Sequence, residues 1–329
     1  MLSGLPPRRS RAALRSLARG ESRRIVLTAL AANLVVAAAK LAAGLVSGSS
    51  AMLAEAAHSL ADSVNEVLLG VSLYRGRVPA DRAHPLGHGR ERFLWAFMAA
   101  LGSFLVGGCL SIALAIRELV EGGGEPTSNL PIAGAVLAAA FAADGVSLLQ
   151  SLRHARREAD ERGQPLWRYL LRASDPALRA VVVEDSAALV GVALAALGLV
   201  VGALVGDSTP DALASLLIGL LLAATAFGLA RPLADFLVGR SLPVEKLQRL
   251  LAILTAAPAV EEVLALQAVY TGPEEAIVAA KARPVATLTV DELTRAMDEL
   301  DHAIRSALPE VAEVYIDLTA FRSDRRPDG

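Results

Sequence analysis

The stretch of residues 51–70 reads AMLAEAAHSLADSVNEVLLG. It is long and apolar enough to cross a bilayer, yet it carries acids and a histidine. On a helix its polar residues recur at intervals of three and four, and so form one stripe: Glu55, His58, Asp62 and Asn65 or Glu66. An ionisable group near mid-membrane costs about 2.5–3.5 kcal/mol on insertion scales, so a helix that keeps several is usually using them.

His58 and Asp62 lie one helical turn apart, a spacing at which two side chains can bind a single cation. A histidine with a carboxylate is a good ligand pair for a divalent metal ion such as zinc. The alternative interpretation is a buried polar seam that only holds one helix against another.

Composition places the chain among membrane proteins. Of 329 residues, 54% are hydrophobic and 4% aromatic, which leaves room for about six spans and one small soluble domain. The formal net charge of −2 argues neither for nor against an acidic partner, and we expect no nucleic-acid partner. The single cysteine, Cys109, excludes an internal disulfide.

The apolar runs predict an α-helical membrane protein with six transmembrane helices, at residues 25–46, 51–74, 93–116, 131–152, 177–201 and 211–234. After Arg240 the composition becomes that of a soluble domain. We therefore predict four regions: a basic N-terminal tail (1–24), a transport domain (25–238), a C-terminal domain (239–322) and a tail (323–329).

Arginines are unevenly distributed between the loops. They crowd the N-terminal tail and the loops at 75–92 and 153–179, whereas the other loops contain neither arginine nor lysine. By the positive-inside rule both termini are cytoplasmic, and an even number of spans returns the chain to the side on which it starts. We expect a multi-pass protein of the cell (inner) membrane. An arginine-rich, acid-poor tail is also typical of a mitochondrial transit peptide, and that alternative stays open.

The C-terminal domain reads as helix, two strands, helix and strand in about 80 residues, a small α+β sandwich. A domain of this size is too small to be an enzyme with its own deep cleft. No nucleophile–base pair and no zincin-type motif accompany the polar clusters, so we expect no enzymatic activity.

A second polar cluster lies in the loop 79–89, PADRAHPLGHG. Asp81, His84 and His88 have metal-ligand spacing, while Pro85 and the glycines predict a tight loop rather than a helix. The alternative is that these histidines merely contact lipid phosphates or cap a helix.

The segments SGSSAMLAEAAHSLADSVNE (47–66) and HPLGHGRER (84–92), in this order, resemble the cation diffusion facilitator family of divalent metal/proton antiporters. The resemblance implies six spans, cytoplasmic termini and a ferredoxin-like, metallochaperone-like C-terminal domain that dimerises. It also implies that His58 and Asp62 form the second-span half of the transport site, and that Asp81, His84 and His88 form a secondary loop site.

The fifth span departs from the family pattern of a histidine or aspartate, three residues, then an aspartate. This chain has the adjacent acids Glu184 and Asp185, and either alignment leaves one ligand position without a ligand. The EDSAA segment resembles the branch that includes a mitochondrial zinc exporter. Adjacent helical residues diverge by about 100°. We place Asp185 slightly ahead as direct ligand, with Glu184 as co-ligand or proton carrier.

The C-terminal domain departs as well, because it has one histidine, His302, and Asp317 in the closing strand, where some family members bind two zinc ions through several histidines. These are too few ligands for a tight binuclear site. In the spans, we expect Lys40 to snorkel and Asn33 and Asp144 to make helix-to-helix hydrogen bonds.

The resulting hypothesis is a homodimeric secondary transporter, without a prosthetic group, that exports a divalent transition metal ion in exchange for protons. Zinc is the expected cargo, bound by His58, Asp62 and Asp185 or Glu184. Two alternatives stay open: a transport-deficient relative acting as a membrane partner or regulatory subunit, and an exporter that prefers Fe²⁺, Co²⁺ or Mn²⁺.

Overall fold

The computed structural model describes residues 30–31, 33–121, 129–161, 163–172, 176–273 and 275–319. The predicted tails, 1–24 and 323–329, lie outside the described residues. The chain forms two compact units: Met1–Leu68 with Met98–Ala230, and Leu69–Phe97 with Arg231–Gly329. The second unit thus takes in the 75–92 loop together with the C-terminal domain.

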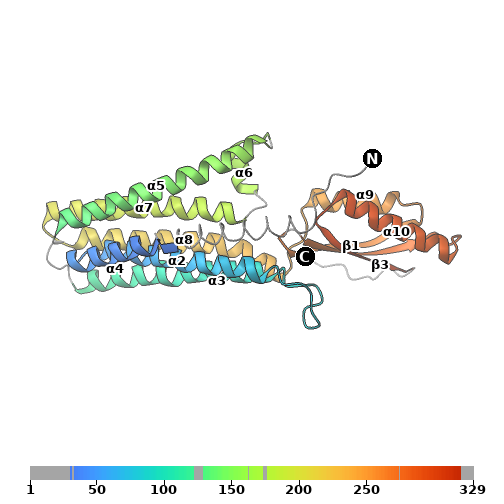
Figure 1. The fold of residues 1–329 in the computed structure, drawn as a ribbon, viewed down its shortest axis with the longest axis horizontal. Helices are drawn as coiled ribbons and strands as arrows, with labels where there is room; N and C mark the ends of the chain where they lie inside the picture. Colours follow the sequence, from blue (N-terminus) through green and yellow to red (C-terminus); the bar gives the residue numbers. More distant parts are fainter. Residues whose placement is uncertain are drawn as a thin grey trace, which may run out of the picture. The chain divides into compact units, whose positions relative to one another are not determined.

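In the part of the chain that the structure describes, a helix lies at each of the six predicted positions (Figure 1). They are Asn33–Ser47, α2 (Ser50–Arg75), Glu91–Glu121, α5 (Leu130–Glu161), α7 (Pro176–Val205) and α8 (Thr209–Val238). The third helix is continuous but consists of α3 (Glu91–Gly102), a π-helical segment η1 (Ser103–Cys109) and α4 (Leu110–Glu121). A short helix that we did not predict, α6 (Leu166–Arg172), follows α5.

Four of these helices are long and apolar enough to cross a membrane by length and composition: Glu91–Glu121, α5, Val181–Val205 within α7, and α8. The helix Asn33–Ser47 is apolar but shorter over its described residues. The helix α2 is long enough at 26 residues, and its polar stripe lowers its hydropathy. The predicted class of α-helical membrane protein with a small α+β domain is confirmed.

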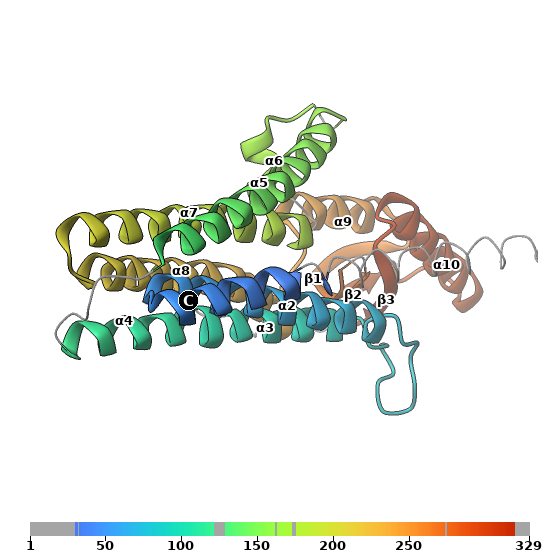
Figure 2. The same cartoon turned by 60° about the vertical axis from the view of Figure 1, so that its left-hand side comes forward.

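Small residues let the helices of the first unit approach closely. Its core is rich in alanine, with Met52, Val192 and Ile218 as larger members. In both views α5 and α7 lie side by side (Figure 2). Close approach of this kind brings the few polar side chains on neighbouring helices within reach of one another.

The N-terminus of α2 is held by a residue from α8. Asp211 is fully buried, and its carboxylate accepts hydrogen bonds from the hydroxyls of Ser49 (2.7 Å) and Ser50 (3.2 Å) and from the backbone N–H of Ala51 (3.1 Å). A carboxylate at the N-terminus of a helix accepts hydrogen bonds from the free N–H groups there and interacts favourably with the positive end of the helix dipole. The serines of the 47–50 segment therefore help to fix the position of α2.

The C-terminal domain has the predicted order of elements: α9 (Val244–Ala256), β1 (Val260–Gly272), β2 (Glu275–Pro284), α10 (Val290–Ala307) and β3 (Val311–Leu318). The sheet order is β1-β2-β3, with β1 antiparallel and β3 parallel to the central β2. Both helices pack on the sheet around Leu250, Val278 and Ile304 (Figure 1). Thr289 and Glu292 form a capping box that starts α10.

Candidate metal centres

The first candidate centre lies in α2. His58 Nε2 is 3.5 Å from Asp62 Oδ2, as the one-turn spacing predicts. The His58 side chain is 5% exposed and that of Asp62 30% exposed. Both residues line a small cavity with room for about one water-sized particle.

Glu184 reaches the same cavity from α7. The remaining lining residues are Ala100, Ser103, Ala187, Leu222, Thr225, Ala226 and Leu229. The cavity therefore combines one imidazole and two carboxylates with otherwise mostly apolar walls, a donor set that suits a divalent transition metal ion.

Asn65 connects α2 to both neighbouring walls of the cavity. Its amide nitrogen is 2.8 Å from Ser103 Oγ and donates to Glu184 Oε1, 3.0 Å away. Ser103 is the first residue of the π-helical segment η1, and π-helical turns are frequent at functional sites. Asn65 was recognised in the polar stripe, whereas nothing in the sequence pattern identified Ser103.

Asp185 faces another helix. Its Oδ2 accepts hydrogen bonds from Ser147 (2.9 Å) and Ser151 (3.4 Å) of α5, and it does not line the cavity. The two adjacent acids thus diverge, as about 100° per residue requires. Of the two, Glu184 is the one placed beside His58 and Asp62.

Several buried polar atoms around this cavity have no hydrogen-bond partner among the described residues. They are His58 Nε2, Asp62 Oδ1 and Asn65 Oδ1. Leaving buried polar atoms unsatisfied is costly, and a bound cation can satisfy a nitrogen and several oxygens at once. The free lone pairs therefore fit a site for a transported ion.

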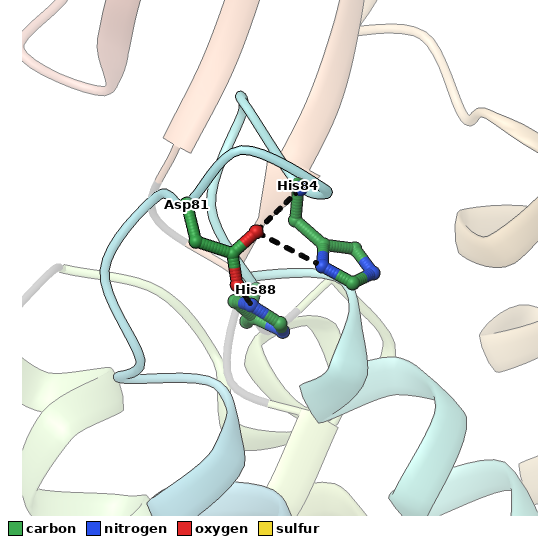
Figure 3. Close-up of side chains that lie close together, drawn as sticks. All are labelled: Asp81, His84 and His88. Atoms are coloured by element: carbon green, nitrogen blue, oxygen red, sulfur yellow. Dashed lines mark hydrogen bonds and ion pairs between the residues drawn. The ribbon is translucent and has the colours of Figure 1, made fainter.

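The second candidate centre is the 75–92 loop, which brings Asp81, His84 and His88 together (Figure 3). Asp81 Oδ2 is 3.1 Å from His88 Nε2, and Asp81 Oδ1 is 3.4 Å from His84 Nδ1. Within the described residues, this is the only set of three such side chains whose ligand atoms all lie within 4.8 Å of one another. The groups lining the α2–α7 cavity are more widely spaced.

Hydrogen bonds within the loop shift the pKa values of Asp81 and His88 toward the charged form of each side chain. The hydrogen bond with His88, followed by the backbone N–H of His84, lowers the pKa of Asp81 to about 2. Hydrogen bonds to Glu91 and then to Asp81 raise the pKa of His88 above its ordinary value. Glu91 Oε1 lies 2.6 Å from His88 Nδ1, and Arg75 donates to the same carboxylate. Glu91 thus orients the imidazole, as outer carboxylates often do at metal sites.

The loop also packs tightly on the β1–β2 hairpin. A side chain at Gly89 would collide with the backbone oxygen of Thr271, so this close approach requires glycine. Gly89, next to His88, is therefore required for the packing of this loop.

Structural roles in the spans were expected for three polar residues, Asn33, Lys40 and Asp144. Asn33 donates a hydrogen bond of 2.6 Å to Glu66 between two helices, as predicted. The expectation that Lys40 snorkels is wrong, because its side chain is 1% exposed and its ammonium lies 2.9 Å from Glu55 Oε2. Asp144 Oδ2 lies 3.9 Å from the same ammonium. Sequence spacing gives no sign of contacts between side chains on different helices.

Residues 26–238 match the family model described as the cation efflux transmembrane domain. The chain belongs to the cation diffusion facilitator family. It is therefore a multi-pass membrane protein, and the four apolar helices agree with this.

Several curated proteins are similar in sequence to this chain. The chain is 31% identical to metal tolerance protein C4 of Arabidopsis thaliana over 77% of this chain and 55% of that protein. It is 30% identical to the mitochondrial proton-coupled zinc antiporter SLC30A9 of Xenopus laevis over 76% of this chain and 44% of that protein. It is 26% identical to the manganese efflux system protein MneP of Bacillus subtilis over 71% of this chain and 74% of that protein. The chain spans about half the length of the first two relatives.

Proposed function

We propose that this cation diffusion facilitator exports a divalent transition metal ion, preferentially zinc, from the cytoplasm in exchange for protons. The observation that carries the proposal is the buried cavity that His58, Asp62 and Glu184 line together. Asp62 and Glu184 supply two negative charges, which offset the +2 charge of the ion in the low-dielectric interior. His58 supplies a neutral nitrogen.

Exchange with protons follows from the chemistry of these ligands. Imidazole and carboxylate groups must be deprotonated before they bind a metal ion, so metal and protons compete for the same atoms. Release of the ion on the far side leaves groups that take up protons there. The similarity to a proton-coupled zinc antiporter supports this coupling.

The choice of zinc over manganese rests on His58. Imidazole binds borderline metals such as zinc better than hard metals such as manganese. Similar chains include both a zinc antiporter and a manganese efflux protein. We expect His58→Asp to broaden transport toward manganese, and an unchanged preference would place selectivity elsewhere.

Flux in proteoliposomes tests the function directly. Purified full-length protein should move zinc against a proton flux reported by a pH-sensitive dye. His58→Ala and Asp62→Ala should abolish flux while the folded protein persists. His154→Ala is the matched control, since His154 is 64% exposed and pairs with Glu158. If either α2 variant keeps most of the wild-type flux at saturating zinc, the site assignment is wrong.

We further propose a homodimer in the cell membrane with cytoplasmic termini, and a secondary metal site at Asp81, His84 and His88. The distribution of arginines between loops supports the orientation. Cysteine labelling on a Cys109→Ser background tests it. Arg82→Cys should react from the cytoplasmic side and Asp207→Cys from the other side, and the reverse pattern would contradict the orientation.

A further inference from the structure

A buried lysine lies between two carboxylates in the first unit. The Lys40 ammonium, from the helix Asn33–Ser47, is 2.9 Å from Glu55 Oε2 of α2 and 3.9 Å from Asp144 Oδ2 of α5. The side chains of Lys40 and Glu55 are 1% and 0% exposed, and Asp144 is 24% exposed. Three helices therefore meet around one positive charge.

The surroundings of this ammonium resemble those of a bound cation. Glu55 Oε1 and Asp144 Oδ2 are buried without a hydrogen-bond partner among the described residues. Glu55 Oε1 faces the backbone of α7 at Gly191, where a side chain would collide with it. The two oxygens nearest the ammonium are Glu55 Oε2 and Asp144 Oδ2, and carboxylate oxygens gathered around one point are ligands that a hard or borderline cation prefers.

The position of this cluster relates it to the transport site. Glu55 lies three residues before His58 on the same face of α2. A free divalent ion at this point would lie next to the transported ion and would compete with it for the charge of the surrounding acids.

We propose that Lys40 is a tethered cation that fills a second cation site formed by Glu55 and Asp144. The inference rests on the proposed function, in which His58, Asp62 and Glu184 bind the transported ion. A covalently held ammonium cannot leave with the metal. The membrane core therefore binds one divalent ion per protomer, and Glu55 and Asp144 stay unavailable to a second one.

Replacement of the ammonium tests this proposal. Full-length protein is equilibrated with Zn²⁺ or with Mn²⁺, freed of unbound metal, and its metal content per protomer is measured by mass spectrometry. Lys40→Met should bind about one more ion per protomer than the wild type. Lys40→Gln, which can still donate to Glu55, should do the same and serves if the methionine variant does not fold.

Two controls assign the additional ion. Lys40→Arg keeps the charge and should keep the wild-type count. Lys40→Met combined with Glu55→Gln removes one carboxylate and should return the count to that of the wild type. A wild-type count with both metals in Lys40→Met and Lys40→Gln would overturn the proposal.

The experiment also separates this inference from the function on which it rests. Asp62→Asn in the otherwise wild-type protein should lose the transport-site ion. If it loses none, the assignment of the transport site fails, whatever the Lys40 variants show. If it loses one ion and the Lys40 variants gain none, only the tethered-cation proposal fails.

Discussion

The amide of Asn65 donates a hydrogen bond to Oε1 of Glu184, 3.0 Å away, and so joins α2 to α7 beside the cavity. The bond leaves Glu184 directed toward His58 and Asp62 rather than toward α5. A ligand held by a neighbouring amide keeps its geometry when the cavity is empty.

The placement of the two adjacent acids predicts different phenotypes. Glu184→Gln should weaken zinc binding by at least about 100-fold, because removal of a mere outer partner of a ligand already costs about 10–100-fold. Asp185→Asn should keep most of the affinity, since an amide can still bond to Ser147 and Ser151. Calorimetry on both variants measures this. Exchange of the two phenotypes would restore Asp185 as the ligand.

Gly191 lets α7 approach Glu55, so the methyl group of Gly191→Ala should collide with Glu55 Oε1 and displace that side chain, three residues before His58. A misplacement of about 1 Å can cost about 100-fold in rate, and we expect zinc flux to fall by at least about tenfold. Gly134→Ala in α5 is the matched control, because no atom lies within 4 Å of the added Cβ. Equal flux in the two variants would count against a close helix contact at Gly191.

Asp211→Ala removes the acceptor for the hydroxyl of Ser49 and the N–H of Ala51. Each buried group left unpaired costs about 1–3 kcal/mol, so the unfolding temperature in detergent should fall clearly. Asp207→Ala, which removes the acceptor for the N–H and the hydroxyl of Thr209 at the start of α8, should cost about 1 kcal/mol. A smaller effect at Asp211 than at Asp207 would contradict this role.

We expect the ion pair of Lys246 and Glu310 to make the stability of the C-terminal domain depend on pH. Burial opposes the charge of Glu310, but the hydrogen bond from Lys246 and the charges of Lys246 and Arg249 lower its pKa. A lowered folded pKa contributes stability above the ordinary value of about 4.3, and the contribution is lost as the pH falls through the folded pKa.

Glu310→Gln should therefore increase hydrogen exchange in β3 at pH 7 and lose this effect as the pH falls through the folded pKa, with a size below about 1 kcal/mol. Asp317→Asn is the control, because its contact with Lys281 is longer, at 3.5 Å, and exposed. An effect of Glu310→Gln that grows on acidification would refute the sign of the pKa shift.

Dimerisation should not need zinc. Residues 239–322 contain a single histidine, His302, and no cysteine, too few ligands for a tight structural zinc site. The full-length protein should keep its dimeric mass by light scattering in detergent with a chelator. Dissociation on chelation, reversed by zinc, would argue against this.

The spacing of residues within one element could be predicted from the sequence, and relations between elements could not. The one-turn pairing of His58 with Asp62 follows from helical periodicity. The choice between Glu184 and Asp185 depends on the rotation of α7 about its axis. That helix is apolar on every side, with alanine, glycine and valine all around, so no polar face indicates its orientation.

Contacts between side chains on different helices could not be predicted from the sequence either. Lys40 and Glu55 are 15 residues apart on different helices, and only the packing of those helices brings them together. The π-helical segment Ser103–Cys109 has no sequence signature either, although it places Ser103 beside Asn65. The C-terminal elements were predictable because each has a clear period of its own and is bounded by turn residues.

The bond network at Asp211 has a mechanical consequence for transport. It holds the N-terminal end of α2, so when this helix tilts, it pivots about that end. With a rise of about 1.5 Å per residue, His58 lies about 12 Å from Ser50 and Glu66 about 24 Å. A tilt of about 5° would move His58 by about 1 Å and Glu66 by about 2 Å, on the same rise. A tilt about this end thus gives the smaller displacement to the candidate ligand His58 and the larger one to Glu66.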